Sequence, residues 1–324
     1  MRTRVKNGDE SSVIRARGRR GEVAKNAEGL EKDFMDQLRK FIESHRERLE
    51  EALARYLPVS AEPGTECLNR ALRYAIFPGG KRLRPMLTLV GAAALCGSTE
   101  RALPVACAIE YLHTSSLILD DLPAMDDACE RRGRKALHLI FGEGIAILAA
   151  LALLNRAYGL MAHVDASKGA LLVAEAARSI GVEGMISGQA TDISVQAETA
   201  SEATLASRNL KTTSLMRLSL GASAILCDAT EEVCAALNRF AECLGAAYQM
   251  GDDLADGIET TGKSVGQDAR LRRPSFALKS DRREVTERAC SLIEEAKSVV
   301  WDALGERSLL LVDFAEYVKG KVLR

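Results

Sequence analysis

Residues 112–127 read LHTSSLILDDLPAMDD, an apolar helical run that ends in four carboxylates within eight residues. An apolar run of this kind is typical of a buried helix. Carboxylates at the end of a buried helix are costly unless positive charge neutralises them. A solvated acidic loop is the ordinary alternative, so this stretch alone does not decide the function.

The segments on both sides of this run have the three- and four-residue apolar spacing of helices. Pro78-Gly79-Gly80 breaks the pattern, and Pro85 suits the first turn of the next helix. There is no alternating β pattern of useful length and no linker that divides the chain. We therefore predict an all-α fold, a bundle of about ten helices around a central cavity. The expected helices span 30–57, 65–77, 86–96, 101–124, 143–163, 169–190, 204–226, 231–258, 282–304 and 307–322.

A second acidic cluster, Asp252-Asp253-Leu254-Ala255-Asp256, follows another apolar stretch. On a helix, Asp252 and Asp256 would lie about 40° apart around the axis and about 6 Å along it, so both could ligate cations. Oxygen ligands without histidine or thiolate favour Mg²⁺, which usually binds one or two carboxylates together with substrate phosphates. Two acidic clusters that each end an apolar helix are harder to explain as solvated surface than one.

Basic residues accompany both clusters. They are Lys81, Arg82 and Arg84, then Arg131, Arg132 and Arg134, and finally Lys211 and Lys263. Each one alone is usually a solvated surface charge. Beside metal-binding carboxylates, such cations describe a site for two diphosphates, one held through metal and one held directly.

Composition excludes several other classes. The 324 residues carry a net charge of −1 and only 4% aromatic residues, which argues against a nucleic-acid partner. The eight cysteines include no Cys-x-x-Cys pair, so we interpret them as reduced core residues of an intracellular, cytoplasmic protein. No run of 18 apolar residues is present, so we expect no membrane span. Residues 1–28 are expected to form a basic, disordered tail, and residues 29–324 a single domain.

The chain resembles the trans-isoprenyl diphosphate synthase (polyprenyl synthetase) family and is most similar to its bacterial geranylgeranyl diphosphate synthases. The resemblance covers the chain from about residue 35 to its end, and the motifs in this order are highly specific. It implies the isoprenoid-synthase type of helical bundle. The matching stretches are GGKRLRP (79–85), HTSSLILDDLPAMDD (113–127), RRG (131–133), FGEGIAILAALALL (141–154), GQATD (188–192), KT (211–212) and QMGDDLADGIETTGK (249–263).

The resemblance implies that the acidic motifs face each other and hold three Mg²⁺ ions on an allylic diphosphate. Asp120 and Asp126 would ligate two of the ions, with Asp121 as a close partner. Asp252 would ligate the third ion, supported by Asp253 and Asp256. A straight helix would turn Asp126 about 240° away from Asp120, so we expect a bulge near Pro123.

The same resemblance assigns the remaining polar residues. Allylic diphosphate contacts fall on Arg131, Lys211 and Lys263; isopentenyl diphosphate contacts on Lys81, Arg84, His113 and Arg132; and the lining of the cation's path on Thr212 and Gln249. The implied catalytic set is Asp120, Asp121, Asp126, Lys211, Asp252 and Lys263. The implied reaction is ionisation, condensation and elimination.

Ser115 and Ser116, about one turn before Asp120, leave room for a long product, so we predict the C20 product geranylgeranyl diphosphate made by a homodimer. Farnesyl diphosphate synthase, a non-catalytic regulatory subunit and a class I terpene cyclase are the alternatives. The chain departs from the usual family pattern at Lys135 and Ala136, where Pro and Thr are expected. It departs again at Arg273 and Ser275, where Lys and Thr are expected.

Overall fold

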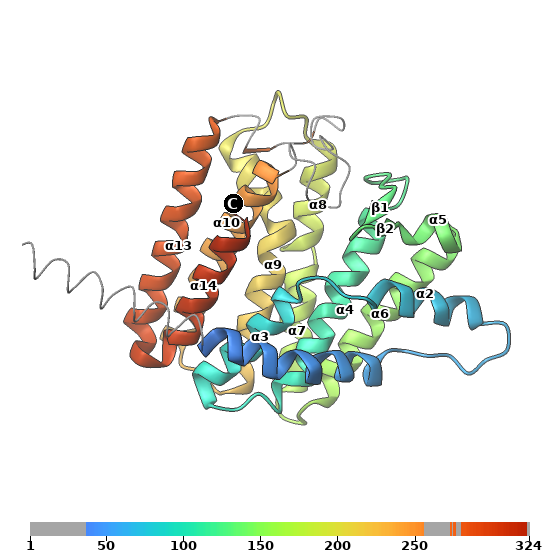
Figure 1. Ribbon diagram of the computed structural model, residues 1–324, viewed down its shortest axis with the longest axis horizontal. Helices are drawn as coiled ribbons and strands as arrows, with labels where there is room; N and C mark the ends of the chain where they lie inside the picture. The colour runs from blue at the N-terminus through green and yellow to red at the C-terminus, as the bar shows by residue number, and fades with distance from the viewer. Residues whose placement is uncertain (1–36, 256–272, 274, 277–279, 323–324) are drawn as a thin grey trace, which may run out of the picture.

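The structure, a computed structural model, describes residues 37–255, 273, 275, 276 and 280–322 (Figure 1). The expected tail, Asp256 and Lys263 lie outside these residues. The first described helix covers residues 37–56. The others are α2 (Glu66–Ile76), α3 (Leu83–Cys96), α4 (Ala102–Asp120), α5 (Leu137–Phe141), α6 (Glu143–His163), α7 (Gly169–Ile180), α8 (Met185–Ser194), α9 (Glu202–Leu226), α10 (Glu231–Ala255), α13 (Arg282–Leu304), the short 3₁₀ helix Gly305–Ser308, and α14 (Leu309–Val322).

These helices confirm the all-α prediction and pack around α4 and α9. Helix α4 packs against α3, α6 and α9, while α10 packs between α9 and α13 (Figure 1). Val105, Ile109 and Leu112 of α4 are completely buried. Burial of each such side chain contributes about 1.5–3 kcal/mol to the stability of the folded state. Helix α4 is therefore firmly held in the core and supports the acidic cluster at its end.

The structure differs from the expected elements in three main places. Helix α4 ends at Asp120 instead of continuing through a bulge, because the next residues turn back and the Asp126 N–H donates to the Asp120 carbonyl over 3.0 Å. The segment expected as one helix over 169–190 is two, since Gly181 caps α7 by donating to the Ala177 carbonyl over 2.8 Å. A small hairpin also forms where no strand was expected, from β1 (Glu130–Arg131) and β2 (Arg134–Lys135), paired antiparallel.

Two described helices, α4 and α6, are long and apolar enough to cross a membrane, although the sequence predicted no span. This is weak evidence, because a core helix meets the same criteria of length and composition. The most apolar window of α4 is 67% buried within the bundle, whereas that of α6 is only 39% buried. Helix α6 therefore presents an apolar face, including Ile147, Leu148 and Leu151, at the surface of this chain.

Asp313 on α14 gives a prediction about stability and pH. Its side chain is only 7% exposed, and burial, with a smaller effect of the Glu316 charge, raises its pKa to about 6. The folded state binds this proton more tightly than the unfolded state. Proton binding at Asp313 therefore stabilises the fold fully below about pH 4, and this contribution is lost as pH rises through 6. Asp313→Asn should therefore raise the free energy of unfolding by about 1–3 kcal/mol at pH 8 and by almost nothing at pH 4.

Urea denaturation at both pH values would measure this difference. Asp302→Asn, on the exposed surface of α13, is the matched control and should change stability at neither pH. An equal effect of Asp313→Asn at pH 4 and pH 8 would contradict the account.

Candidate active site

The first acidic motif begins with Asp120, the last residue of α4, which is 8% exposed. Its Oδ1 atom accepts hydrogen bonds from Gln189 Nε2 at 2.8 Å and from Lys211 Nζ at 2.9 Å. Burial is the largest single influence and would raise the pKa of Asp120, but the charges of Lys211 and Arg131 and the hydrogen bonds from Lys211 and Gln189 together outweigh it, and the pKa lies below its usual value. Asp120 is thus an ionised, nearly buried carboxylate beside a fixed ammonium group.

Asp121 and Asp126 complete this motif in different ways. Arg131 Nε lies 2.9 Å and 3.2 Å from the two carboxylate oxygens of Asp121. Arg273 Nη2 lies 2.8 Å from Asp126 Oδ1. Burial raises the pKa of both carboxyl groups, and the negative charge of Asp120 raises it further. Like charges crowded together in this way are relieved by a bound cation.

This donor set fits Mg²⁺ that arrives with a phosphate ligand. Among the described residues, no three His, Cys, Asp or Glu side chains gather into a ready-made metal site. Mg²⁺ usually takes one or two protein carboxylates and completes its shell with water and substrate phosphates. The oxygen-only groups Asp120, Asp126 and Asp252 therefore suit Mg²⁺, with the diphosphate supplying the remaining ligands.

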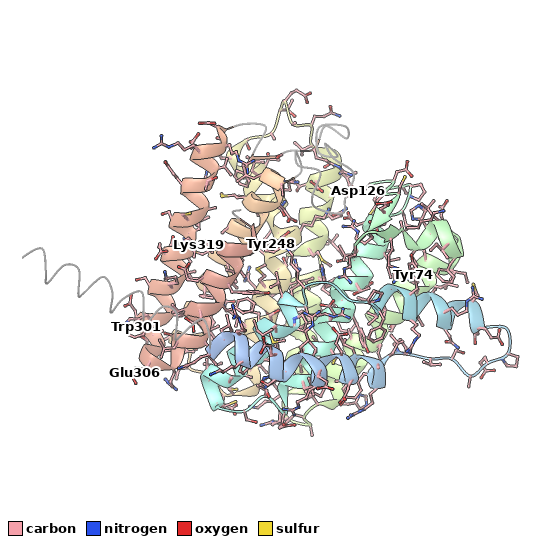
Figure 2. The ribbon with its side chains drawn as sticks, viewed as in Figure 1. Tyr74, Asp126, Tyr248, Trp301, Glu306 and Lys319 are labelled. Atoms are coloured by element: carbon pink, nitrogen blue, oxygen red, sulfur yellow. The ribbon has the colours of Figure 1, made fainter. Side chains whose placement is uncertain are left out.

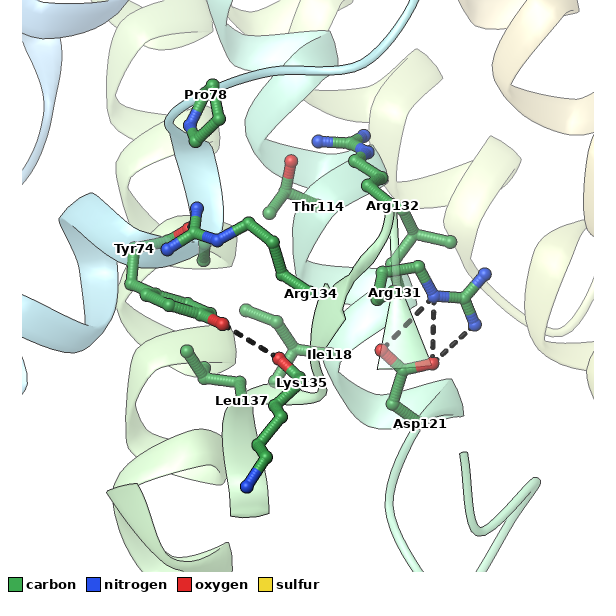
Figure 3. A pocket seen from close by; sticks show the side chains of 12 residues that line it. Tyr74, Pro78, Thr114, Ile118, Asp121, Arg131, Arg132, Arg134, Lys135 and Leu137 are labelled. Atoms are coloured by element: carbon green, nitrogen blue, oxygen red, sulfur yellow. Dashed lines mark hydrogen bonds and ion pairs between the residues drawn. The ribbon is translucent and has the colours of Figure 1, made fainter. Parts of the chain in front are cut away.

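The hairpin places two consecutive arginines beside this motif (Figure 3). Arg131 ends β1 and binds Asp121, while Arg132 and Gly133 form the turn with φ angles of 56° and 70°. Two-residue hairpin turns of type I′ require positive φ at both positions, which is unfavourable for Arg132. Strained non-glycine residues of this kind concentrate at functional sites.

The departures at Lys135 and Ala136 are accommodated by Arg134 and Tyr74 (Figure 3). The Arg134 guanidinium lies 3.6 Å from the centre of the Tyr74 ring and donates to the Phe77 carbonyl over 2.7 Å. The Tyr74 hydroxyl in turn donates to the Lys135 carbonyl over 2.9 Å. The hairpin is thus fixed to α2 by contacts that need neither the proline nor the threonine of the usual pattern.

A second group of cations lies along α3, α4 and the hairpin tip. Arg84 Nη1 is 3.4 Å from His113 Nε2, and the Arg84 Nε atom is buried with no partner among the described residues. Burial and the neighbouring charges of Arg84 and Arg132 lower the pKa of His113 far below its usual value, so His113 is neutral. Lys81 lies nearby in the sequence and is exposed. At the hairpin tip, Arg132 Nη2 lies 3.7 Å from Glu110 Oε1, whereas Arg84 has no carboxylate partner among the described residues. A buried cation donor such as Arg84 is suited to bind an anion.

Arg82, in the middle of the same basic stretch, has a structural role instead. It begins α3 with a φ of 53° and binds Glu50 at 2.9 Å and Glu110 at 2.6 Å. A Cβ atom at Gly79 would lie 2.1 Å from the Arg82 guanidinium, so a larger residue there would push this group away from Glu50 and Glu110. Arg82 therefore anchors the start of α3, with Lys81 just before it and Arg84 in its first turn.

A buried ion-pair network joins the first acidic motif to the second. Lys211 Nζ contacts Asp192 Oδ2 at 3.0 Å as well as Asp120. Arg208 Nε lies 2.7 Å from Asp192 Oδ1, and Arg208 Nη1 lies 3.0 Å and 3.1 Å from the two oxygens of Asp253. The backbone N–H of Phe276 also donates to Asp253 over 2.8 Å. The network therefore links the end of α4 to α10 through α8 and α9.

Three members of this site were not predicted as site residues. Gln189 and Asp192 lie in the GQATD stretch that carried the family resemblance, so a signal was available for both. Arg208, one turn before Lys211 on α9, had no such signal. A Cβ atom at Gly188 would lie 2.2 Å from the backbone nitrogen of Lys211. This glycine therefore allows α8 to approach α9 closely enough for the network to form.

Tyr248 on α10 relates the second motif to the cation group. Asp252 precedes Asp253 at the end of α10. Burial raises the pKa of Tyr248 to about 12, and the charge of Asp252 adds to this effect, while Arg84 and Arg132 act in the opposite direction. Tyr248 thus lies within electrostatic range of both Asp252 and the cations. Figure 2 places Asp126 at the end of the bundle opposite Trp301 and Glu306.

The remaining predicted residues have defined contacts. Thr212 Oγ1 donates to Gln249 Oε1 over 2.7 Å, and Gln249 Nε2 donates to Asp253 over 2.8 Å. Ser115 Oγ donates to the Ala150 carbonyl of α6 over 2.9 Å, and Ser116 Oγ donates to the His113 carbonyl over 2.8 Å. The two serines therefore lie on different sides of α4, Ser115 buried against α6 and Ser116 half-buried.

Comparison with known proteins relates this chain to enzymes that make prenyl diphosphates. A family model described as polyprenyl synthetase matches residues 65–298. A geranylgeranyl diphosphate synthase of Pantoea ananas is 41% identical over 68% of this chain and 74% of its own length. A farnesyl diphosphate synthase of Geobacillus stearothermophilus is 39% identical over 70% of this chain and 79% of its own length.

Solved structures show the same relationship. A geranyltransferase of Helicobacter pylori, solved as a complex with magnesium and isoprenyl diphosphate, has a TM-score of 0.76 at 28% identity. The similarity covers 87% of this chain and 96% of that one. With a family model matched over most of its length and relatives above 30% identity, the chain belongs to the polyprenyl synthetase family.

Proposed function

We propose that the protein is a trans-prenyltransferase that condenses isopentenyl diphosphate with dimethylallyl, geranyl or farnesyl diphosphate to give geranylgeranyl diphosphate and pyrophosphate. The observation that carries this proposal is the coexistence of two different anion-binding groups at one end of the bundle. One contains the carboxylates Asp120, Asp126 and Asp252. The other contains Arg84, His113 and Arg132, which have a cation excess and suit a second diphosphate without metal.

The allylic diphosphate would bind at the acidic motifs. Asp120, Asp126 and Asp252 would hold Mg²⁺, three ions by family resemblance, which stabilises negative charge on a departing diphosphate. Lys211 is fixed between Asp120 and Asp192 and presents its ammonium group to the same charge. Arg131, held by Asp121, and Lys263 would add direct contacts. These groups would favour C–O bond cleavage to an allylic cation.

Isopentenyl diphosphate would bind at the cation group. Lys81, Arg84 and Arg132 would contact its phosphates, and neutral His113 would donate one hydrogen bond. Thr212 and Gln249 are oriented by each other and by Asp253, so their oxygens would line the path of the cation. The isopentenyl double bond attacks the cation, and the released diphosphate takes the proton, so no side-chain base is needed.

Two rival functions leave parts of this arrangement unexplained. A class I terpene cyclase has no second diphosphate, so Arg84, His113 and Arg132 would have no ligand. A non-catalytic regulatory subunit would not need Asp120, Asp126 and Asp252 together. The departure at Arg273 keeps a cation at that position, and its guanidinium binds Asp126.

We also propose a homodimer, because the apolar face of α5–α8 would be covered by a second copy. Membrane association is the other use of such a face. We favour a second copy because residues from four successive helices contribute to the face, as expected of a large protein interface. Its exposed members are Leu139, Ile140, Ile147, Leu148, Leu151, Leu171, Ile186 and Ile193. The cytoplasmic location and the 29–324 domain boundary stay predictions.

The test is an assay of purified protein with Mg²⁺, isopentenyl diphosphate and each allylic primer in turn, with product lengths read by chromatography. Geranylgeranyl diphosphate should be the main product, and omission of Mg²⁺ should abolish it. A main C15 product would replace the assignment with farnesyl diphosphate synthase. Diphosphate release from an allylic primer without isopentenyl diphosphate would favour the cyclase.

Ser115→Phe should shorten the main product from C20 to C15, because an aromatic ring one turn before Asp120 would block growth of the chain. Since Ser115 is buried against α6, the ring also costs about 1–3 kcal/mol in overpacking. Thermal melting should therefore accompany the product analysis, and half-buried Ser116→Phe provides a second variant. Ser115→Ala is the matched control and should keep the C20 product. An unchanged C20 product from both phenylalanine variants would contradict this role.

A further inference from the structure

Two cysteines lie together where α3 and α9 end. Cys96 is the last residue of α3 and is exposed, and Cys227 directly follows α9 and is half-buried. Both Sγ atoms point at one carbonyl oxygen, that of Ala92, at 3.3 Å from Cys96 and 4.0 Å from Cys227. This shared acceptor brings the two thiols together although they lie 131 positions apart in the sequence.

The packing of α3 on α9 fixes this arrangement. Ser223 Oγ donates to the Thr88 carbonyl over 2.8 Å, and one turn further along each helix the Cys227 thiol meets the Ala92 carbonyl. The approach is close, since a Cβ atom at Gly91 would lie 2.8 Å from Leu220. The thiols are therefore held in register by rigid helices rather than by a mobile loop.

The surroundings of Cys227 act on its pKa in two directions. Burial raises the pKa of Cys227 to about 12, and a hydrogen bond to Cys96 contributes to this rise. The charges of Lys168 and Arg101 act on Cys227 in the opposite direction, with smaller effect. Because Cys96 is exposed and Cys227 is half-buried, a peroxide reaches the Cys96 sulfur first, and Cys96 is the attacking sulfur.

We propose that Cys96 and Cys227 form a redox-sensitive dithiol that a hydroperoxide converts into an intramolecular disulfide between α3 and α9. The Cys96 thiolate attacks one peroxide oxygen, which breaks the O–O bond and leaves a sulfenic acid and hydroxide. The Cys227 sulfur then attacks the Cys96 sulfur and expels water. Two thiols and one hydrogen peroxide thereby give one disulfide and two waters.

This disulfide would change stability without disturbing the active site. Cys227 lies 16 residues beyond Lys211 along α9, about 24 Å at the helical rise, and Cys96 lies 12 residues beyond Arg84, about 18 Å. The bond would close a loop of more than 100 residues, which restricts the unfolded chain. A rise in Tm of about 5 °C or more is expected, with kcat within about twofold of the reduced enzyme.

The experiment uses the full-length protein treated with a small excess of hydrogen peroxide. Trypsin should give a reducible cross-link between peptides 83–101 and 218–239, together with the rise in Tm. Because the second peptide also contains Cys234, Cys234→Ser should keep the cross-link, whereas Cys96→Ser and Cys227→Ser should each abolish it and the rise in Tm. Cys67→Ser, at the exposed start of α2, is a further control that should change neither result.

Three outcomes would overturn the proposal. One is sulfenic or sulfinic acid at Cys96 without a cross-link. Another is a cross-link between two copies of the chain, visible as a reducible dimer on denaturing gels. The third is a cross-link that survives in Cys227→Ser but is lost in Cys234→Ser. None of these depends on the prenyltransferase assignment, because each is read from thiols and mass rather than from activity.

Discussion

Asp120→Asn is expected to lower kcat by about three orders of magnitude or more, the largest catalytic effect anticipated in this protein. Asparagine preserves the shape of the side chain but removes the negative charge that would hold Mg²⁺ on the diphosphate. It also leaves the Lys211 ammonium group without one of its two carboxylate partners. Steady-state assays with isopentenyl and farnesyl diphosphates would measure the loss, and Asp252→Asn should show a loss of the same order.

Asp127→Asn is the matched control for this prediction. Asp127 belongs to the same acidic cluster but is exposed, and its φ of 47° is one that asparagine tolerates well. Its rate should stay within about twofold of wild type. Comparable rates for Asp120→Asn and Asp127→Asn would show that charge in this cluster is not specific to the reaction.

The second large effect is expected in stability. Arg208→Met should lower the free energy of unfolding by about 3–5 kcal/mol, because it leaves two buried carboxylates, Asp192 and Asp253, without their shared partner. Arg208→Lys should recover only part of the loss, since one ammonium group cannot reproduce a planar guanidinium that bridges both. Urea denaturation monitored by circular dichroism would measure both variants.

Arg239→Met provides the comparison at an exposed site. Arg239 on α10 is about half exposed and pairs with Glu295, whose side chain is exposed to a similar extent. Such pairs contribute at most about 1 kcal/mol. If Arg208→Met were no more destabilising than Arg239→Met, the ion-pair network between the acidic motifs would not hold them together.

Where residues are regularly spaced, the sequence was informative. Helix α6 was predicted at its observed bounds, because an apolar run between Gly142 and the polar segment after His163 leaves little choice. The end of α4 was harder to locate, because the helix stops through backbone hydrogen bonds around Pro123 that apolar spacing does not encode. The Arg132–Gly133 turn lacks the usual Asn-Gly signal, so the hairpin was missed.

Within the candidate site, the motifs predicted which residues would gather but not how they pair. Arg82 and Arg84 stand two residues apart with the same charge, yet only Arg82 is neutralised in the core by Glu50 and Glu110. Arg208 was invisible because its partners, Asp192 and Asp253, are 16 and 45 residues away. Pairing across helices depends on the packing of α8, α9 and α10, which no local pattern specifies.

A crystal structure with Mn²⁺ and a non-hydrolysable allylic diphosphate analogue would decide whether the two acidic motifs act together on one substrate. Anomalous scattering should locate metal between the analogue's phosphates and the carboxylates of Asp120 and Asp126 on one side and Asp252 on the other. Phosphates bound without metal, or metal bound to only one motif with the analogue elsewhere, would contradict the proposed mechanism.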